Sequence, residues 1–299
     1  MSAAKRGKSH GAGLFGKVAA LVSLLFGPAR TATLLAIMLA VFCGGTYFAW
    51  QKVNPRVLAS SQYAVTPSDV EITQPPAWIH SGIREEVFRD ASLDGQLSIM
   101  DDDLTERVGT AFSLHPWVAR VHRVSKHHPA QVVVHLSYRR PVCMVKVTEG
   151  LLPVDSQGVV LPVGDFSPVE ASRYPRLVDV GTGPVGPVGT RWGDDRVVGG
   201  AEIAAALGPV WEEFKLQRIV PMPTNSRGAT KDYVYALYTH GGTRIIWGRA
   251  PNAKAPGELP PEEKIARLKW AAEKNGGLDN YGAQVLDVHT LRVSSLPKR

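Results

Sequence analysis

One segment near the N-terminus is apolar and uncharged over an unusual length. It covers residues 31–50, TATLLAIMLAVFCGGTYFAW, between Arg30 and Lys52. A helix of this length rises by about 30 Å, which matches the thickness of the hydrocarbon core of a bilayer. Tyr47 and Trp50 lie at its end, where aromatic side chains favour the membrane interface. The pattern predicts a transmembrane helix over residues 31–50.

A cleaved signal peptide and a lipoprotein anchor are the alternatives for this segment. No clear small-residue cleavage pattern follows the apolar run, and bulky Phe42 precedes Cys43, so both are disfavoured. An earlier apolar stretch, Leu14 to Phe26, contains Lys17 and ends at a Gly-Pro pair. It is too short and too interrupted for a second span, and we expect an interfacial helix there.

Beyond residue 65 the spacing of apolar positions changes from strand-like to helix-like and back. The predicted order is strand, helix, helix, strand, strand, at residues 70–73, 83–91, 101–112, 118–124 and 131–139. His127-His128-Pro129 is the expected turn between the last two strands.

The second of these helices has the clearest pattern. Leu104, Val108 and Phe112 are spaced four residues apart, so they share one face. Asp101 or Asp102 is the expected N-cap. The strand that follows is expected to start with Val118, Arg120, His122 and Val124.

The remainder of the chain predicts a mixed β-sheet with flanking helices, which makes the fold class α+β. Expected strands lie at 151–154, 159–163, 216–222, 232–239, 243–248, 284–288 and 291–294. A Gly- and Pro-rich stretch at 181–189 predicts a loop. Asp194 or Asp195 is expected to cap a helix that ends near Gly208. A last helix is expected to begin at Pro260-Pro261 and to stop at Gly276, with an inner stripe that consists of Ile265, Leu268 and Ala272.

The net charge of +7 is distributed unevenly. Residues 1–68 contain no Asp or Glu, and the first 50 residues hold five Lys or Arg. The other 29 cations (34 minus five) nearly balance the 27 acids. The basic excess therefore precedes the apolar segment, which favours a cytoplasmic N-terminus and an exported body over nucleic-acid binding.

The chain offers little that resembles a catalytic or metal site. Its two cysteines, Cys43 and Cys143, are predicted to lie in the membrane and in the exported part, so they cannot pair within one chain. Catalytic motifs such as G-x-S-x-G, H-E-x-x-H and the P-loop lysine are absent. His127-His128 and Asp101-Asp102-Asp103 are interpreted as a turn and a helix start. We therefore predict no catalytic, cofactor-binding or metal-binding residue, no small-molecule substrate and no enzyme activity.

Several motifs occur in the order that is typical of one family. The string HPWVARVHRVSKHHPAQVVVHLSYRRPV, followed by VDSQGVVLPV, YPRLVDVG, GGTRIIWGR, EEKIARLKWAAE and QVLDVHTLRV, resembles the FtsQ/DivIB cell-division family. The resemblance covers almost the whole chain. It implies a cytoplasmic tail at 1–30, a transmembrane helix at 31–50, a juxtamembrane linker at 51–64, a POTRA domain at 65–147 and an FtsQ-like β domain at 148–299.

The same resemblance implies a function. Members of this family are non-enzymatic scaffolds of the bacterial divisome in the inner membrane, with an extracytoplasmic C-terminal part, at the septum. They bind FtsB/DivIC-like and FtsL-like partners. We hypothesise that Thr290, Leu291, Arg292 and Val293 present an open sheet edge to such a partner. The chain departs from the family pattern in two places, where TQPPAW replaces a Gly-Asn turn and DVHT replaces the usual DLRY.

Two other classes of protein remain as alternatives. Another POTRA-containing envelope assembly protein would usually end in a β-barrel, whereas only about 150 residues follow here and two helices are expected among them. A membrane-anchored periplasmic enzyme or binding protein would need a pocket with convergent polar groups, and the sequence nominates none.

Overall fold

The computed structural model describes residues 30–58, 63–93, 97–224, 233–253, 256–281 and 285–289. The chain divides into two compact units, residues 1–64 and residues 65–299, and each is described by itself. The fold is α+β, with one apolar N-terminal helix and mixed sheets, so this part of the predicted fold class is confirmed.

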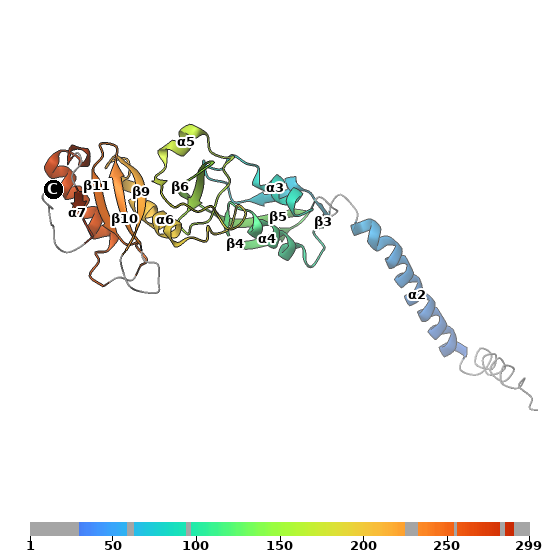
Figure 1. Cartoon of the computed structure of the whole chain (residues 1–299). Coiled ribbons are helices and arrows are strands. Elements are labelled where there is room, and N and C mark those ends of the chain that lie inside the picture. The colour runs from blue at the N-terminus through green and yellow to red at the C-terminus, as the bar shows by residue number, and fades with distance from the viewer. Residues whose placement is uncertain are drawn as a thin grey trace, which may run out of the picture. The chain divides into compact units, whose positions relative to one another are not determined.

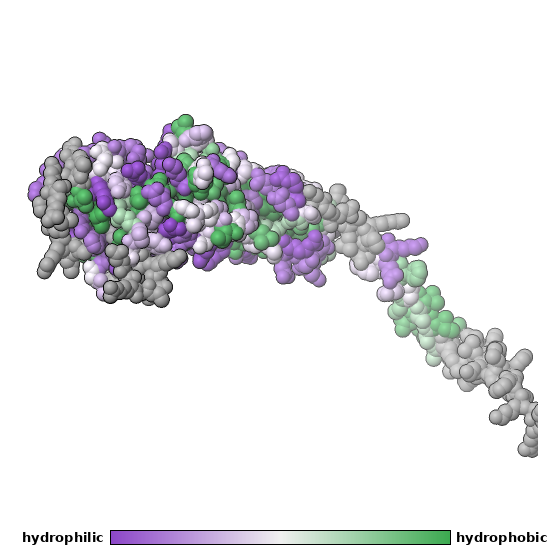
Figure 2. Space-filling view, viewed as in Figure 1, coloured by the Kyte–Doolittle hydropathy of each residue, from purple (hydrophilic) through white to green (hydrophobic). Residues whose placement is uncertain are grey.

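The first unit contains α2 (Arg30–Leu58), a helix of 29 residues. Its stretch Leu34–Lys52 is long and apolar enough to cross a membrane, and none of it is buried within the protein. Figure 2 shows this stretch as a continuous apolar band on the α2 of Figure 1. Met38, Phe42 and Trp50 are each at least 66% exposed. Water would be a poor solvent for so much apolar surface, and hydrocarbon is a good one.

The second unit begins with a three-stranded sheet covered by two helices. Its elements are β2 (Val70–Ile72), α3 (Ile83–Asp90), α4 (Leu104–Leu114), β4 (Val118–His127) and β5 (Gln131–Tyr138). The strand order is β2-β5-β4, with β2 parallel and β4 antiparallel to β5. A two-stranded sheet of β1 (Ala64–Val65) and β3 (Leu97–Ser98) and the short helix η1 (Pro67–Asp69) complete this part.

The two predicted helices of this part are present, but the start of α4 differs from the expectation. Leu104, Val108 and Phe112 are fully buried, as the spacing predicts. The N-cap is Asp103 rather than Asp101 or Asp102, and its side chain makes no capping hydrogen bond. The Asp101 carboxylate instead accepts from the Ser98 amide at 3.1 Å. The Asp101 side chain therefore stabilises a tight turn at 98–101 and does not cap the helix.

Two β-bulges change which side chains of β4 face inward. The register against β5 shifts between Val118 and Arg120 and again between Val121 and Arg123. The residues packed against the core are therefore Val118, Val121 and Val124, three apart, instead of alternate residues. Each bulge inserts one residue and advances the side-chain pattern by one position.

The chain passes from β5 directly into a mixed seven-stranded sheet with the order β12-β11-β10-β9-β8-β6-β7. Its strands are β6 (Pro141–Val147), β7 (Gly150–Asp155), β8 (Arg176–Leu177), β9 (Leu216–Pro223), β10 (Tyr233–Thr239), β11 (Arg244–Gly248) and β12 (Val285–Asp287). Helices α5 (Pro168–Arg173), α6 (Asp195–Leu207) and α7 (Pro261–Asn275) and the short helices η2 (Gly208–Val210) and η3 (Leu278–Tyr281) accompany it. The predicted hairpin of β10 and β11 is confirmed.

The predicted hairpin around DSQG forms only in part. Its first arm is β7, but Val159 and Val160 make single bridges, to Arg191 and Val154, instead of a strand. The reason is Asp155, whose carboxylate accepts from the amides of Gln157 and Val159 at 2.8 and 2.9 Å. These bonds tighten the turn and take an amide that a ladder would need.

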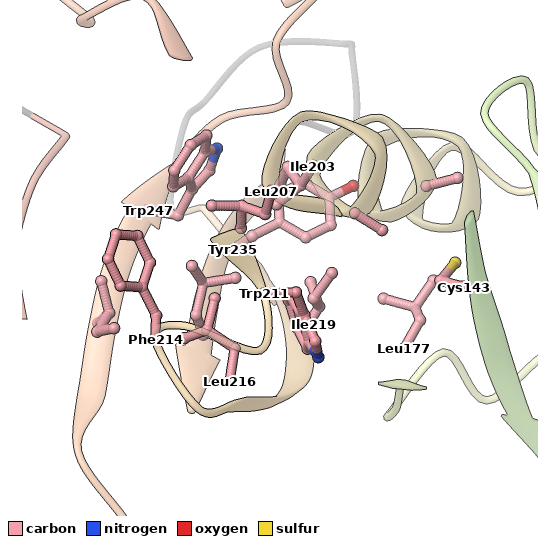
Figure 3. Close-up of a cluster of buried hydrophobic side chains, with 14 of the residues drawn as sticks. Cys143, Leu177, Ile203, Leu207, Trp211, Phe214, Leu216, Ile219, Tyr235 and Trp247 are labelled. Atoms are coloured by element: carbon pink, nitrogen blue, oxygen red, sulfur yellow. The ribbon is translucent and has the colours of Figure 1, made fainter. Parts of the chain in front are cut away.

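The core of the seven-stranded sheet lies beneath α6. Figure 3 shows Trp211, Ile219 and Tyr235 near the side of α6 that faces the sheet. Close packing here requires glycine in the helix, because a Cβ at Gly199 would lie 2.3 Å from the Tyr235 hydroxyl oxygen. A Cβ at Gly200 would lie 2.6 Å from Leu177. The two glycines lower helix propensity but let α6 approach the strands.

The Asp194 carboxylate caps α6 and gives the fold a pH dependence. Burial alone would raise its pKa, but hydrogen bonds from Arg196 and Thr182 outweigh burial and lower the pKa of Asp194 from 3.8 to about 2. The ionised form is thus favoured in the folded state, and its stabilisation is present above about pH 4 and lost as the pH falls toward 2.

We expect Asp194→Asn to abolish about 2 kcal/mol of this pH-dependent stability. The measurement is the free energy of unfolding between pH 5 and pH 2, where the wild type should lose stability more steeply than the variant. Asp195→Asn removes the neighbouring exposed acid and should leave the slope unchanged. Equal slopes for wild type and Asp194→Asn would contradict the assignment.

A buried carboxylate joins the two halves of the second unit. Asp165 is 7% exposed. It accepts from the amides of His80 and Ser81 at 2.8 and 2.6 Å and from the Trp117 indole at 2.7 Å. The Ser81 hydroxyl donates to it at 3.2 Å. Four donors from residues 80, 81 and 117 thus converge on one residue that follows β7, and they attach the segment 161–166 to the three-stranded part.

Candidate partner-binding edge

The last described strand, β12, lies at one end of the seven-stranded sheet. It runs parallel to β11, with Arg244 opposite Val285 and Ile246 opposite Asp287. The Val288 amide donates to the Ile246 carbonyl at 3.2 Å. Because backbone groups alternate along a strand, Asp287 directs its N–H and C=O away from β11. Within the described ranges no strand pairs with that side.

The hypothesised binding residues Thr290, Leu291, Arg292 and Val293 lie outside the described residues. They follow immediately after His289, the last residue that the structure describes. The structure therefore describes β12 but not the hypothesised binding segment, and the binding role of residues 290–293 stays a prediction.

The chain at the end of β12 is held by its own side chains. The Asp287 carboxylate accepts from the His289 amide at 3.0 Å, and its Oδ1 lies 2.5 Å from the His289 Nδ1. The His289 carbonyl accepts from the Leu259 amide at 3.3 Å. These bonds hold His289 at the end of β12.

The loop that carries Leu259 is held in turn by Glu258. Its Oε1 accepts from the Arg249 amide at 2.5 Å and from the Lys264 ammonium at 2.6 Å. The Arg249 guanidinium lies 3.8 Å from its Oε2. One carboxylate thus connects the end of β11, the following loop and α7.

Lys264 lies on the inner face of α7, although the predicted stripe of Ile265, Leu268 and Ala272 did not include it. It is 2% exposed and occupies the inner face of α7 with Leu268 and Ala271, whereas Ile265 and Ala272 are only partly buried. Its ammonium lies 4.9 Å from the centroid of the Trp247 ring. Burial lowers the pKa of Lys264, and the Glu258 carboxylate opposes that shift. Ion pairing and a cation–π contact replace the lost hydration of the ammonium.

Gly248 explains how these groups come so close. Its φ of +91° is in the region that favours glycine. A Cβ there would lie 2.2 Å from the Glu258 Oε1 and 2.6 Å from the Cβ of His289. One sequence signal could have indicated this cluster. A Trp-Gly-Arg motif stands at the end of a predicted strand, an acid follows ten residues after the glycine, and a lysine lies in the next helix.

Other candidate chemistry on the described part of the chain is sparse. No three His, Cys, Asp or Glu side chains gather there in a way that could hold a metal ion. Cys143 is fully buried, and burial raises the pKa of its thiol, so it is not a reactive nucleophile. An open cleft of about 650 Å³ lies between the β6–β7 turn and residues 179–184.

The structure also describes the residues that were considered as possible metal ligands. His127 ends β4, exposed, with its Nε2 3.2 Å from the Ser125 hydroxyl oxygen, and His128 precedes Pro129 in the turn. Asp101, Asp102 and Asp103 precede α4.

Comparison with known proteins leaves the family open. No protein-family model matches the chain. A search of the curated proteins also finds no significant match.

Proposed function

We propose that this chain is a single-pass membrane scaffold of the FtsQ/DivIB type, which binds partner division proteins and helps to organise septal wall synthesis. Its N-terminus would lie in the cytoplasm, and residues 65–299 would lie outside it. The proposal is supported by the ordered motifs of the sequence, by the apolar helix α2 and by the position of β12 at the end of a sheet.

The two parts of the second unit correspond to a POTRA domain and a β domain in this proposal. The order β2, α3, α4, β4, β5 and the sheet order β2-β5-β4 support the first assignment. The second unit also has two hydrophobic cores, one formed by residues 65–138 together with Leu161 and Phe166 and one within residues 142–288. Separate cores are what two domains of this size require.

The observation that carries the binding function is the backbone of Asp287. Its N–H and C=O point away from β11, so a partner strand could bond to them and extend the sheet. The neighbouring Val285 is 39% exposed and would offer apolar contact. Glu258 and the Asp287 carboxylate hold this edge in place before binding, which lowers the entropy that binding costs. The partners would be single-span proteins of the FtsB/DivIC and FtsL type, and the role would be non-enzymatic.

Two-colour imaging of the full chain and its partner tests both parts of the proposal. The wild-type fusion should concentrate at midcell together with the labelled FtsB/DivIC-type protein of the same genome. Asp287→Pro removes the outward amide without removing a bond to β11. We expect this variant to lose at least about 90% of the partner signal, since strand pairing depends on that edge.

Asp287→Ala is the matched control, because it removes the same carboxylate but keeps the amide. It should retain clearly more partner than Asp287→Pro at equal protein level by immunoblot. A uniform membrane signal for the wild type would refute the division role. Full partner recruitment by Asp287→Pro would refute the edge as the contact.

A further inference from the structure

The strands β4 and β5 lie in a segment without acidic residues. Residues 108–148, which number 41, hold six Lys or Arg and five His but no Asp or Glu, although the chain has 27 acids. The one longer acid-free segment, residues 1–68, contains the apolar helix α2. A basic sheet therefore follows a membrane-spanning candidate in the same chain.

The outer face of the three-stranded sheet gathers two of these arginines and three of these histidines. Val132, Val134 and Leu136 of β5 are buried, so the residues between them point outward. Arg123 lies opposite His135 and His127 opposite Gln131 in the register. We name the exposed set that shares this side the cationic face: Arg120, His122, Arg123, His127 and His135. His122 belongs to it because its Nε2 lies 3.1 Å from the hydroxyl oxygen of Ser137, which lies opposite Arg120.

Little opposes this charge on the same side of the sheet. Glu71 of β2 lies opposite Val133 and accepts from the Gln131 amide group at 3.2 Å. Arg120 and Arg123 form no ion pair with any described residue. The cationic face therefore has unpaired positive charge that an anionic partner would neutralise.

Protection of a sheet edge is the simpler explanation of charged residues on β4. Edge strands often carry charges and bulges that prevent pairing with other chains, and β4 has both. That explanation predicts charges of either sign on the edge strand alone. It accounts neither for His135 on the central strand β5 nor for the absence of acids over residues 108–148.

We propose that the cationic face docks on an anionic lipid surface. This inference rests on the membrane anchor of the proposed function. Eleven residues, 53–63, separate the apolar stretch from β1. The residues 53–58 belong to α2, so the eleven residues reach at most about 30 Å, which limits how far β1 can lie from the bilayer surface. Each cation near an anionic membrane adds a favourable term that salt screens.

The test uses the full chain in lipid nanodiscs, with a fluorophore on the cationic face. Ser137→Cys carries the probe in a Cys43→Ala background, since Cys143 is fully buried and does not react. Nitroxide on the lipid headgroups quenches a probe that is close to the surface. Discs of zwitterionic lipid are compared with discs that contain about 30% phosphatidylglycerol. A probe at Ala266→Cys on the exposed side of α7 is the control.

We expect quenching at position 137 to rise at least about threefold in anionic discs and to vanish in high salt. The variant Arg120→Glu/Arg123→Glu should remove the rise, whereas Lys146→Glu/Lys269→Glu, an equal change of net charge elsewhere, should keep it. Equal quenching in both lipids, or equal loss in both double variants, overturns the docking proposal. A chain that does not co-elute with the discs overturns the anchor as well.

Discussion

Asp165→Ala should lower the free energy of unfolding of the second unit by about 3 to 5 kcal/mol. The carboxylate accepts from four donors, and the Trp117 side chain that supplies one of them is fully buried. Its removal leaves the two part-buried backbone amides and the buried indole without this acceptor. The measurement is denaturant unfolding of the full chain in detergent, followed by tryptophan fluorescence.

Two variants separate this effect from a loss of charge. Asp165→Asn keeps an oxygen acceptor but turns an amide group toward one set of donors, so an intermediate loss is expected. Asp102→Ala removes an exposed acid without a hydrogen-bond role and should change stability by less than about 0.5 kcal/mol. An unchanged midpoint for Asp165→Ala would show that the junction does not depend on this residue.

Glu258→Gln should cost about 3 kcal/mol of stability, because it leaves the buried ammonium of Lys264 without its counter-charge. Lys264→Met should cost less, since Glu258 keeps the Arg249 amide and guanidinium. The double variant should be more stable than the sum of the single effects predicts, by about 1 to 3 kcal/mol. The measurement is a double-mutant cycle on the free energy of unfolding.

The variant Glu258→Gln also tests the proposed partner binding at β12. Glu258 positions Leu259, and Leu259 holds the His289 carbonyl, so Glu258→Gln should also weaken partner recruitment at protein levels equal to wild type. Glu273→Gln, which removes an exposed acid of α7 away from this loop, is the control. Strictly additive single effects would show that Glu258 and Lys264 do not act as a pair.

Local patterns predicted the elements of this fold more reliably than their ends. The helix α4 was predicted correctly from the spacing of Leu104, Val108 and Phe112, because helical spacing depends only on neighbours one turn away. The phase of β4 could not be predicted, because each bulge depends on pairing with β5, which is a long-range property. The start of α4 was wrong because Asp101 bonds to the Ser98 amide.

The candidate site could be predicted only as a location. A strand at 284–288 was expected, and β12 lies there. Lys264 was missed because a lysine on the inner face of a helix contradicts the usual pattern unless its partner is known. That partner, Glu258, lies in a loop, and Trp247 comes from β11, so three separate segments must be brought together before the lysine can be buried.

The two bulges of β4 also limit what kind of contact this half of the protein can make. A strand whose ladder is twice interrupted and that carries Arg120 and Arg123 is a poor template for another strand, so the proposed contact there would depend on side-chain charge. Contacts of that kind weaken as ionic strength rises, whereas backbone pairing at β12 should tolerate salt. A salt titration would therefore release one attachment while the other persists.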